Sequence, residues 1–221
     1  MSIRSHLVFE IDIQAALSQY IVDLFVDQTD AQARITATTS EKGLPQIDLR
    51  PEEGWMLCLL TQMIGAKRAV EFGTLAGYSA TWLAKGLGED GRLLSLEYSE
   101  KHAAIARENL KAAGLETRVD VRVGDAHEII DTLDEEFDLA FLDADKSGYD
   151  HYLTWALAHV RRGGLIVAHN AFQHADILKA ASETNESVVA MQHFNERIAK
   201  ESRLTSTIIP VGDGLLVAVV N

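Results

Sequence analysis

The chain has 221 residues, 47% of them hydrophobic and 24% charged, which is an ordinary composition for one soluble globular domain. Its formal net charge of −13 argues against a large phosphate-binding surface, because affinity for nucleic acids comes mainly from lysine and arginine side chains. A small molecule is therefore a better expected partner than RNA or DNA.

No run of apolar residues is long enough to span a membrane, and the N-terminus lacks the basic start and apolar stretch of a signal peptide. These patterns predict a cytoplasmic protein with no membrane partner. The one cysteine, Cys58, excludes an intramolecular disulfide. Its leucine neighbours predict a buried thiol and not a nucleophile.

The first 50 residues predict helices that precede the strand and helix repeat. Apolar residues within Ile11–Phe25 fall three and four positions apart and form one face of an amphipathic helix. A second short helix is predicted at Asp30–Thr39, followed by a loop at Glu41–Arg50. Pro51 and the two acids after it suit the first turn of a further helix, which runs to Met63.

A strand, a glycine turn and a helix follow in direct succession. Arg68–Phe72 predicts a short strand, Gly73 and Gly77 mark the turn, and Tyr78–Lys85 has helical spacing. A glycine turn that opens a helix points free N–H groups at a ligand, which is how doubly wound α/β folds hold nucleotide-like cofactors. The same pattern also fits a plain turn that needs glycine only for its backbone angles.

The next strand, Arg92–Glu97, ends in an acid 24 positions after Gly73. An exposed acid at this strand tip is placed to accept hydrogen bonds from ribose hydroxyls, so we expect its loss to weaken cofactor binding and to leave folding intact. The glycine loop lacks the G-x-G-x-x-G pattern of dinucleotide sites, which favours an adenosine cofactor without a pyrophosphate over a nicotinamide cofactor. A helix capped by Ser99 then runs to Gly114.

Three further strands are predicted at Val119–Val123, Phe137–Leu142 and Leu165–Ala168. The carboxyl ends of parallel strands meet at one edge of a sheet, where open α/β sheets bind their ligands. The residues directly after these three strands are therefore expected to lie near one another. They are Gly124–Ala126, Asp143–Lys146 and His169–Asn170.

The C-terminal third predicts helices at Ala175–Ser182 and Val188–Arg203. Two β-rich runs follow, Thr205–Ile209 and Leu215–Val220, joined by the turn Pro210–Gly214, which lets them pair antiparallel. Strands and helices that alternate before such a pair predict an α/β fold.

Six blocks of this sequence, in order, resemble the cation-dependent O-methyltransferases, the family of caffeoyl-CoA and catechol O-methyltransferases. The resemblance runs from about Gln19 to the C-terminus and rests on Glu71–Ser79, Leu96–Glu97, Gly124–Ala126, Asp143–Lys146, Gly163–Val167 and Pro210–Leu215. It implies a Rossmann-like, doubly wound and mostly parallel seven-stranded sheet, with extra N-terminal helices and a C-terminal antiparallel strand pair.

The same resemblance implies a single domain, 1–221, with a core at 51–221. Residues 1–50 would form a helical region that packs on the substrate mouth and contributes to a homodimer, or a helix that only caps its own domain. The implied cofactor is S-adenosylmethionine (SAM), with Ser79 at its methionyl carboxylate and Glu97 on its ribose. The implied cofactor positions are Leu49, Glu71, Gly73, Thr74, Ser79, Glu97, Asp125, Ala126, Asp143 and Asp145.

By this family match, Asp143, His169 and Asn170 are metal positions and Lys146 is catalytic, together with Asp143. A divalent cation would hold a vicinal diol and lower the pKa of the attacking hydroxyl. A lysine near a cation and a sulfonium has a disfavoured ammonium form, which suits a general base. Alternatively, Lys146 is a surface lysine paired with Asp145.

One position departs from the family pattern, which has Asp-Asn where this chain has His169-Asn170. Magnesium prefers oxygen ligands, whereas imidazole suits later transition metals, so the expected ion changes from Mg²⁺ towards Mn²⁺ or another transition metal. The substitution leaves two further alternatives: activity that does not require a metal ion, and a His169 that only packs against its neighbours. His174 is a further candidate for substrate contact.

The function that these residues and the resemblance imply is O-methylation of a catechol or related vicinal diol. Two alternatives stay open: methylation of a hydroxylated tRNA base, and a SAM-binding relative that is inactive or metal-independent because of His169.

Overall fold

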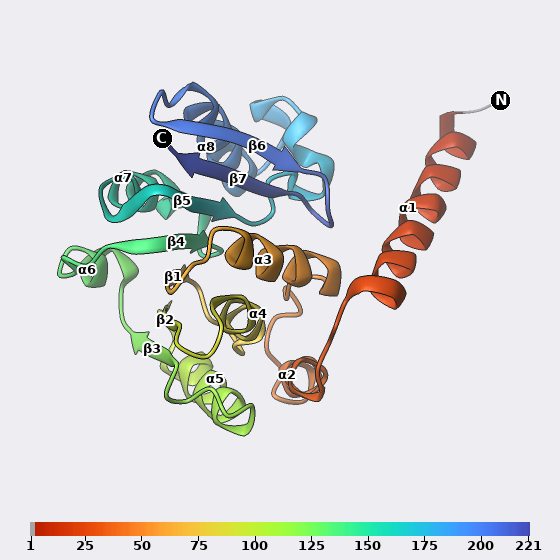
Figure 1. Cartoon of the computed structure of the whole chain (residues 1–221). Coiled ribbons are helices and arrows are strands. Elements are labelled where there is room, and N and C mark those ends of the chain that lie inside the picture. The colour runs from red at the N-terminus through yellow and green to blue at the C-terminus, as the bar shows by residue number, and fades with distance from the viewer. Residues whose placement is uncertain (1–2) are drawn as a thin grey trace.

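The computed structural model describes residues 3–221, with side chains described for residue 13 and residues 15–221. Seven strands form one sheet in the order β3-β2-β1-β4-β5-β7-β6 (Figure 1). Strands β1 to β5 run parallel to one another, and β7 runs antiparallel to both β5 and β6. This confirms the predicted mostly parallel sheet with its C-terminal antiparallel pair. The strands are β1 Arg68–Phe72, β2 Arg92–Glu97, β3 Val119–Val123, β4 Phe137–Leu142, β5 Val160–Ala168, β6 Leu204–Ile209 and β7 Leu215–Val220.

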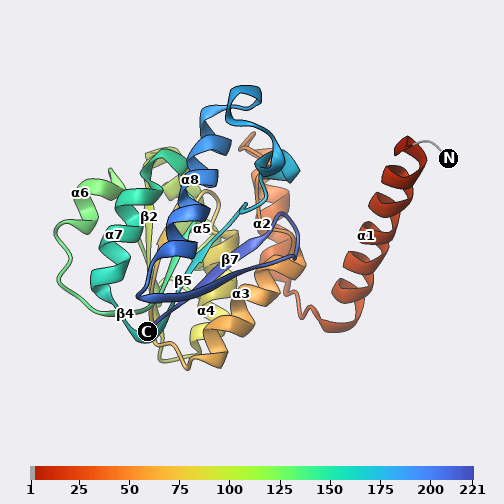
Figure 2. The same cartoon turned by 90° about the horizontal axis from the view of Figure 1, so that it is seen from above.

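Helices cover both faces of the sheet, with α7 and α8 on one side and α3 and α4 on the other (Figure 2). The α-helices are α1 Ile3–Phe25, α2 Asp30–Glu41, α3 Pro51–Met63, α4 Tyr78–Leu87, α5 Glu100–Ala112, α6 Ala126–Ile130, α7 Tyr149–His159 and α8 Glu186–Lys200. Three short 3-10 segments are η1 Lys146–Gly148, η2 Gln173–Leu178 and η3 Ala181–Glu183.

Two hydrophobic clusters form because successive residues of a strand point to opposite faces of the sheet. Ala69 of β1 faces the cluster that contains Leu57 and Cys58 of α3. Val70, the next residue, faces the cluster that contains Leu153 of α7. Cys58 is 1% exposed, so the predicted buried thiol is confirmed. With both faces covered, the carboxyl edge of the sheet is left to bind a ligand.

The predicted helix at Ala175–Ser182 is wrong. The segment instead contains the two short 3-10 turns η2 and η3, and His174 and Ala175 have φ of 54° and 69°. These left-handed angles cannot continue an α-helix of L-residues. The carboxylate of Asp213 accepts a hydrogen bond from the backbone N–H of His174 at 2.6 Å, which holds the chain in this turn.

The helix α8 also differs from its predicted bounds. It begins at Glu186, because the side chain of Asn185 accepts a hydrogen bond from the backbone N–H of Val188 at 3.0 Å and caps the first turn. It ends at Lys200 and not at Arg203. The helix α7, for which we predicted no bounds, follows η1 directly and brings Tyr149 and Tyr152 into the core.

Helix α1 projects away from the rest of the molecule in both views and contacts α3 (Figures 1 and 2). The hydroxyl of Ser18 donates a hydrogen bond to Glu52 of α3. Large apolar side chains of this helix are exposed, including Leu17 and Leu24 at 58% each and Tyr20 at 60%. Within residues 3–221, no helix is both long enough and apolar enough to cross a membrane.

Candidate active site

A pocket of about 1010 Å³ opens at the carboxyl edge of the parallel strands. It brings together residues from the segment before α3, the glycine loop after β1, and the ends of β2 to β5. Of the residues expected at the site, all except Glu71 line it. They are Leu49, Gly73, Thr74, Ser79, Glu97, Asp125, Ala126, Asp143, Asp145, Lys146, His169 and Asn170.

The loop after β1 requires glycine at its first position. Gly73 has a φ of +94°, and a Cβ atom there would overlap the backbone carbonyl oxygen of Asp143. Gly77, with a φ of +89°, precedes the first turn of α4. The loop can therefore lie against the end of β4, and it presents its backbone to the pocket.

Gly73→Ala should lower the free energy of unfolding by about 1 to 3 kcal/mol for the left-handed φ alone, and further for the overlap with Asp143. Gly114→Ala is a matched control, because Gly114 has a φ of +71° and a Cβ atom at that position would meet no other atom within 4 Å. Denaturant unfolding of both variants separates the cost of the left-handed φ from the cost of the overlap with Asp143. Equal losses would show that the close approach to Asp143 adds nothing.

Glu97 lies at the end of β2 as expected, but its side chain is buried and not exposed, with 8% of the residue accessible. Its Oε2 atom accepts hydrogen bonds from the backbone N–H groups of Thr74 at 3.1 Å and Leu75 at 2.9 Å. Its Oε1 atom accepts one from the N–H of Ser99 at 2.8 Å. The expectation that this acid acts only on a ligand is therefore corrected: the carboxylate also holds the glycine loop to the end of β2.

Glu71 lies behind the pocket wall and is fully buried. Its carboxyl group accepts hydrogen bonds from the hydroxyls of Ser79 and of Ser95, the latter at 2.5 Å. Burial raises the pKa of Glu71 to about 8, although both serine hydroxyls lower it. Glu71 thus reaches the pocket only through Ser79, whose position it fixes.

Two of the remaining predicted cofactor positions, Asp125 and Asp145, cap local helical turns. The Asp125 carboxylate accepts a hydrogen bond from the N–H of His127 at 2.8 Å and caps α6. The Asp145 carboxylate accepts from the N–H of Gly148 at 3.1 Å and caps η1. Leu49 is 5% exposed and lines the same pocket. Asp125 thus caps a helix and also borders the pocket.

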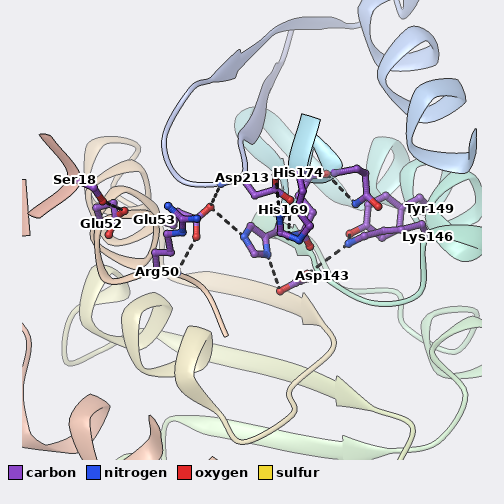
Figure 3. A network of polar contacts seen from close by, with 12 residues as sticks. Ser18, Arg50, Glu52, Glu53, Asp143, Lys146, Tyr149, His169, His174 and Asp213 are labelled. Atoms are coloured by element: carbon purple, nitrogen blue, oxygen red, sulfur yellow. Dashed lines mark hydrogen bonds and ion pairs between the residues drawn. The ribbon is translucent and has the colours of Figure 1, made fainter. Parts of the chain in front are cut away.

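Lys146 is buried and points towards Asp143 (Figure 3). Its Nζ atom donates a hydrogen bond to the Tyr149 hydroxyl at 2.6 Å and lies 3.5 Å from the Asp143 Oδ1 atom. Tyr149 in turn donates to the backbone carbonyl of Leu142 at 2.8 Å. Burial lowers the pKa of the Lys146 ammonium, and the nearby Asp143 carboxylate opposes this shift. The structure thus pairs this lysine with Asp143, and not with Asp145 at the surface.

His169 follows β5 and lies between two carboxylates (Figure 3). Its Nδ1 atom is 3.2 Å from the Asp143 Oδ2 atom, and its Nε2 atom is 3.2 Å from the Glu53 Oε1 atom. The residue is 3% exposed. Burial alone would lower the pKa of the imidazole, but Asp143 and Glu53 outweigh it and raise the value to about 10. Each ring nitrogen of His169 thus faces a carboxylate oxygen.

Asn170, the third implied metal position, has a φ of 57° and donates a hydrogen bond from its amide nitrogen to the Asp213 Oδ2 atom at 3.1 Å. No group of three or more His, Cys, Asp or Glu side chains in the described part of the chain is arranged to hold a metal ion. Each ring nitrogen of His169 faces a carboxylate oxygen at 3.2 Å and so is not directed at an open position for an ion. The side chains, as they are arranged, do not fit a divalent cation.

Glu53, Asp213 and Tyr149 are contacts of the site that sequence reasoning did not assign to it. Glu53 is 2% exposed and accepts hydrogen bonds from the backbone N–H groups of Arg50 at 2.7 Å and Asp213 at 2.8 Å. Glu53 belongs to a helix start, and Asp213 to a turn. Both were interpreted only as local structure, although the turn is one of the six family blocks.

His174 lies at the rim of the pocket, with its side chain 83% exposed. Its Nδ1 atom is 3.6 Å from the Asp213 Oδ1 atom. The side chain is therefore free on most of its surface. A contact between His174 and a substrate stays a prediction.

The model of the O-methyltransferase family matches residues 23–220 of this chain. The catechol O-methyltransferase of Niastella koreensis is 40% identical over 214 residues, which cover 93% of this chain and 96% of that protein. The chain therefore belongs to the O-methyltransferase family, and the resemblance seen in its sequence blocks is confirmed.

Two solved structures share the fold over almost their whole length. The O-methyltransferase from Bacillus cereus in complex with S-adenosylhomocysteine (SAH) has a TM-score of 0.85 and 36% identity to this chain. The match covers 93% of this chain and 97% of that one. The O-methyltransferase TomG from Streptomyces achromogenes in complex with SAM has a TM-score of 0.86 and 32% identity, covering 93% and 96%. The seven-stranded sheet with helices on both faces is thus the fold of an O-methyltransferase.

Proposed function

We propose that this protein transfers a methyl group from SAM to one hydroxyl of a catechol-type small molecule. The observation that carries the proposal is a single pocket with two unlike halves. One half is the glycine loop with Glu97, and the other contains a buried lysine beside Asp143. The relatives support the two halves separately, since one is named a catechol O-methyltransferase and two solved structures contain SAM or SAH.

The first half suits an adenosine cofactor without a pyrophosphate. The start of α4 offers backbone N–H groups, which favour a carboxylate such as that of the methionyl moiety. Ser79, fixed by Glu71, would contact this carboxylate. Glu97 would accept hydrogen bonds from the ribose, beside those it already accepts from Thr74 and Leu75.

The second half suits deprotonation of a phenolic hydroxyl. The hydroxyl proton passes to Lys146 Nζ, whose burial favours the neutral amine. The oxygen then forms a bond to the methyl carbon as the carbon–sulfur bond of SAM breaks, which leaves the methyl ether and SAH. A second, adjacent hydroxyl would donate a hydrogen bond to the Asp143 carboxylate and orient the ring. We assign no step to a divalent ion, because His169 and Asn170 do not offer it a fitting set of ligands.

A methylation screen tests this proposal. The purified protein is incubated with SAM and with catechol, caffeoyl esters or catechol-type flavonoids, each with a chelator and with added divalent ions. Phenols with a single hydroxyl are the matched control, since they lack the group that would bind Asp143. Monomethyl ethers of the diols are expected, with far less product from the single phenols. The absence of methylation of every diol by a protein that binds SAM would contradict the proposal.

The exposed apolar side chains of α1 support a homodimer in which this helix packs against a second copy. A contiguous apolar surface of this kind is costly to leave in water. The apolar stripe, defined here as Ile13, Leu17, Tyr20, Ile21 and Leu24, lies on one face of the helix.

The double variant Leu17→Lys, Leu24→Lys should convert the dimer to a monomer, because it places two charges in the proposed interface. The double variant Ala15→Lys, Gln19→Lys is the control, since these exposed residues lie on the opposite face of α1. Light scattering gives the mass in solution. A dimer that survives the first double variant would place the interface elsewhere.

A further inference from the structure

The contacts of His169 raise the question of what an imidazole does at this place in an O-methyltransferase. The ring connects three elements that are distant in sequence, since Glu53 belongs to α3 and Asp143 follows β4. It lines the pocket beside Asp143, on which Lys146 also converges. The ring therefore lies next to the groups that would meet the acceptor (Figure 3).

The hydrogen-bond partners determine how many protons the ring carries. A neutral imidazole has one donor and one acceptor nitrogen, whereas each nitrogen of His169 faces a carboxylate oxygen at 3.2 Å. The Glu53 carboxylate accepts two backbone N–H groups besides, those of Arg50 and Asp213, so all of its contacts are donors. The second oxygen of Asp143 lies 3.5 Å from the Lys146 Nζ atom. Each carboxylate is thus surrounded by donor groups, and the ring between them has to donate from both nitrogens.

The charge of this ring equals that of the pair of groups it would replace. In the Asp-Asn pattern that this sequence resembles, the residue at position 169 would carry one negative charge, and a divalent ion beside it would carry two positive ones. Their sum is a single positive charge. A doubly protonated His169 carries the same single positive charge without any ion.

We propose that the imidazolium of His169 takes the place of the divalent cation, so that methyl transfer in this protein proceeds without a metal ion. Glu53 holds the ring, and the ring contacts one oxygen of the Asp143 carboxylate. Lys146 lies near the other oxygen of that carboxylate. His169 is then a positioning residue. Its charge offsets the negative charge that develops on the acceptor oxygen as its proton moves to Lys146. The catalytic part of this inference rests on the proposed function, whereas the loss of the metal site does not.

Metal binding can be measured independently of activity. Manganese is titrated into the wild-type protein, His169→Asp and His169→Asn, each with SAH present, and bound Mn²⁺ is followed by electron paramagnetic resonance. The wild type and His169→Asn should show no stoichiometric site. His169→Asp should bind Mn²⁺ on the order of 100-fold more tightly than the wild type, because a carboxylate ligand replaces a cation. A wild-type site as tight as that of His169→Asp would overturn the inference.

Activity then provides a second readout. Wild-type methylation of catechol should be unchanged by a chelator, whereas His169→Asp should lose activity in chelator and regain it with Mn²⁺ or Mg²⁺. His169→Asn should be slow under both conditions, since it supplies neither the charge nor a carboxylate. Loss of wild-type activity in chelator, restored by one ion, would overturn the inference.

Two controls keep these outcomes distinct. SAH affinity is measured for each variant, so that a misfolded variant is recognised, and in that case the wild-type titration and chelator assay decide alone. If no variant methylates any diol although each binds SAH, the proposed function fails, and the manganese titration still decides whether His169 has replaced the metal. Nitrogen-15 resonances of the His169 ring at pH 8 should show both nitrogens protonated, and a neutral ring would contradict the proposal.

Discussion

Lys146→Ala should lower turnover on catechol by about 10²- to 10⁴-fold, which is the usual contribution of a general base to the chemical step. The affinity for SAM should change little, because the lysine contacts Tyr149 and Asp143 and not the glycine loop. Single-turnover kinetics with saturating SAM, together with calorimetric SAM titration, separates the two effects.

The matched variant Lys146→Arg keeps the positive charge beside Asp143 but cannot act as a base near neutral pH. It should be nearly as slow as the alanine variant. Near-normal turnover in either variant would show that another group accepts the hydroxyl proton.

Glu97→Ala should weaken SAM binding by about 10- to 100-fold, since hydrogen bonds to a charged group contribute roughly 1.5 to 3 kcal/mol. It should also lower the free energy of unfolding, because the backbone N–H groups of Thr74, Leu75 and Ser99 lose their acceptor. Calorimetry measures the first effect and denaturant unfolding the second.

Glu100→Ala is the control for this variant, because the side chain of Glu100 is 77% exposed and three residues away. Its replacement should leave both quantities near the wild-type values. If Glu97→Ala kept wild-type SAM affinity, the residue would have no role beyond holding the loop.

The sheet could be predicted from the sequence because each of its strands is marked by a short local pattern of residues. Arg92–Glu97, Val119–Val123 and Phe137–Leu142 are short apolar or alternating runs, and each coincides with an observed strand. The polar residues directly after such runs were brought to one edge by the parallel arrangement itself. Position along a strand was therefore enough to gather Asp143 and His169 in one pocket.

The contacts within that pocket could not be predicted, because they join residues that no sequence window contains. Glu53 and His169 are 116 positions apart, and Glu53 and Asp213 are 160 apart. The role of His169 depends on which groups face its two nitrogens, and only one of them, Asp143, was expected nearby. A histidine in the place of an aspartate was thus interpreted as a different metal ligand, whereas the fold gives it two carboxylate partners.

The burial of Glu97 could not be predicted from the sequence either. Its place at a strand tip is visible in the sequence, but the glycine loop that covers it also depends on the close approach of Gly73 to Asp143. The false helix at Ala175–Ser182 has the same kind of cause, since the Asp213 carboxylate holds the preceding turn from a distant part of the chain. In each case a long-range contact outweighs the local pattern.

The fate of the methyl group decides whether this protein is the proposed catechol O-methyltransferase. The protein is incubated with catechol and with SAM whose methyl group carries deuterium, and the products are analysed by mass spectrometry. We expect one labelled methyl ether of catechol for each SAH formed, with the label bound to oxygen. Formation of SAH without the ether, or no turnover by a protein that binds SAM, would contradict the proposed methyl transfer.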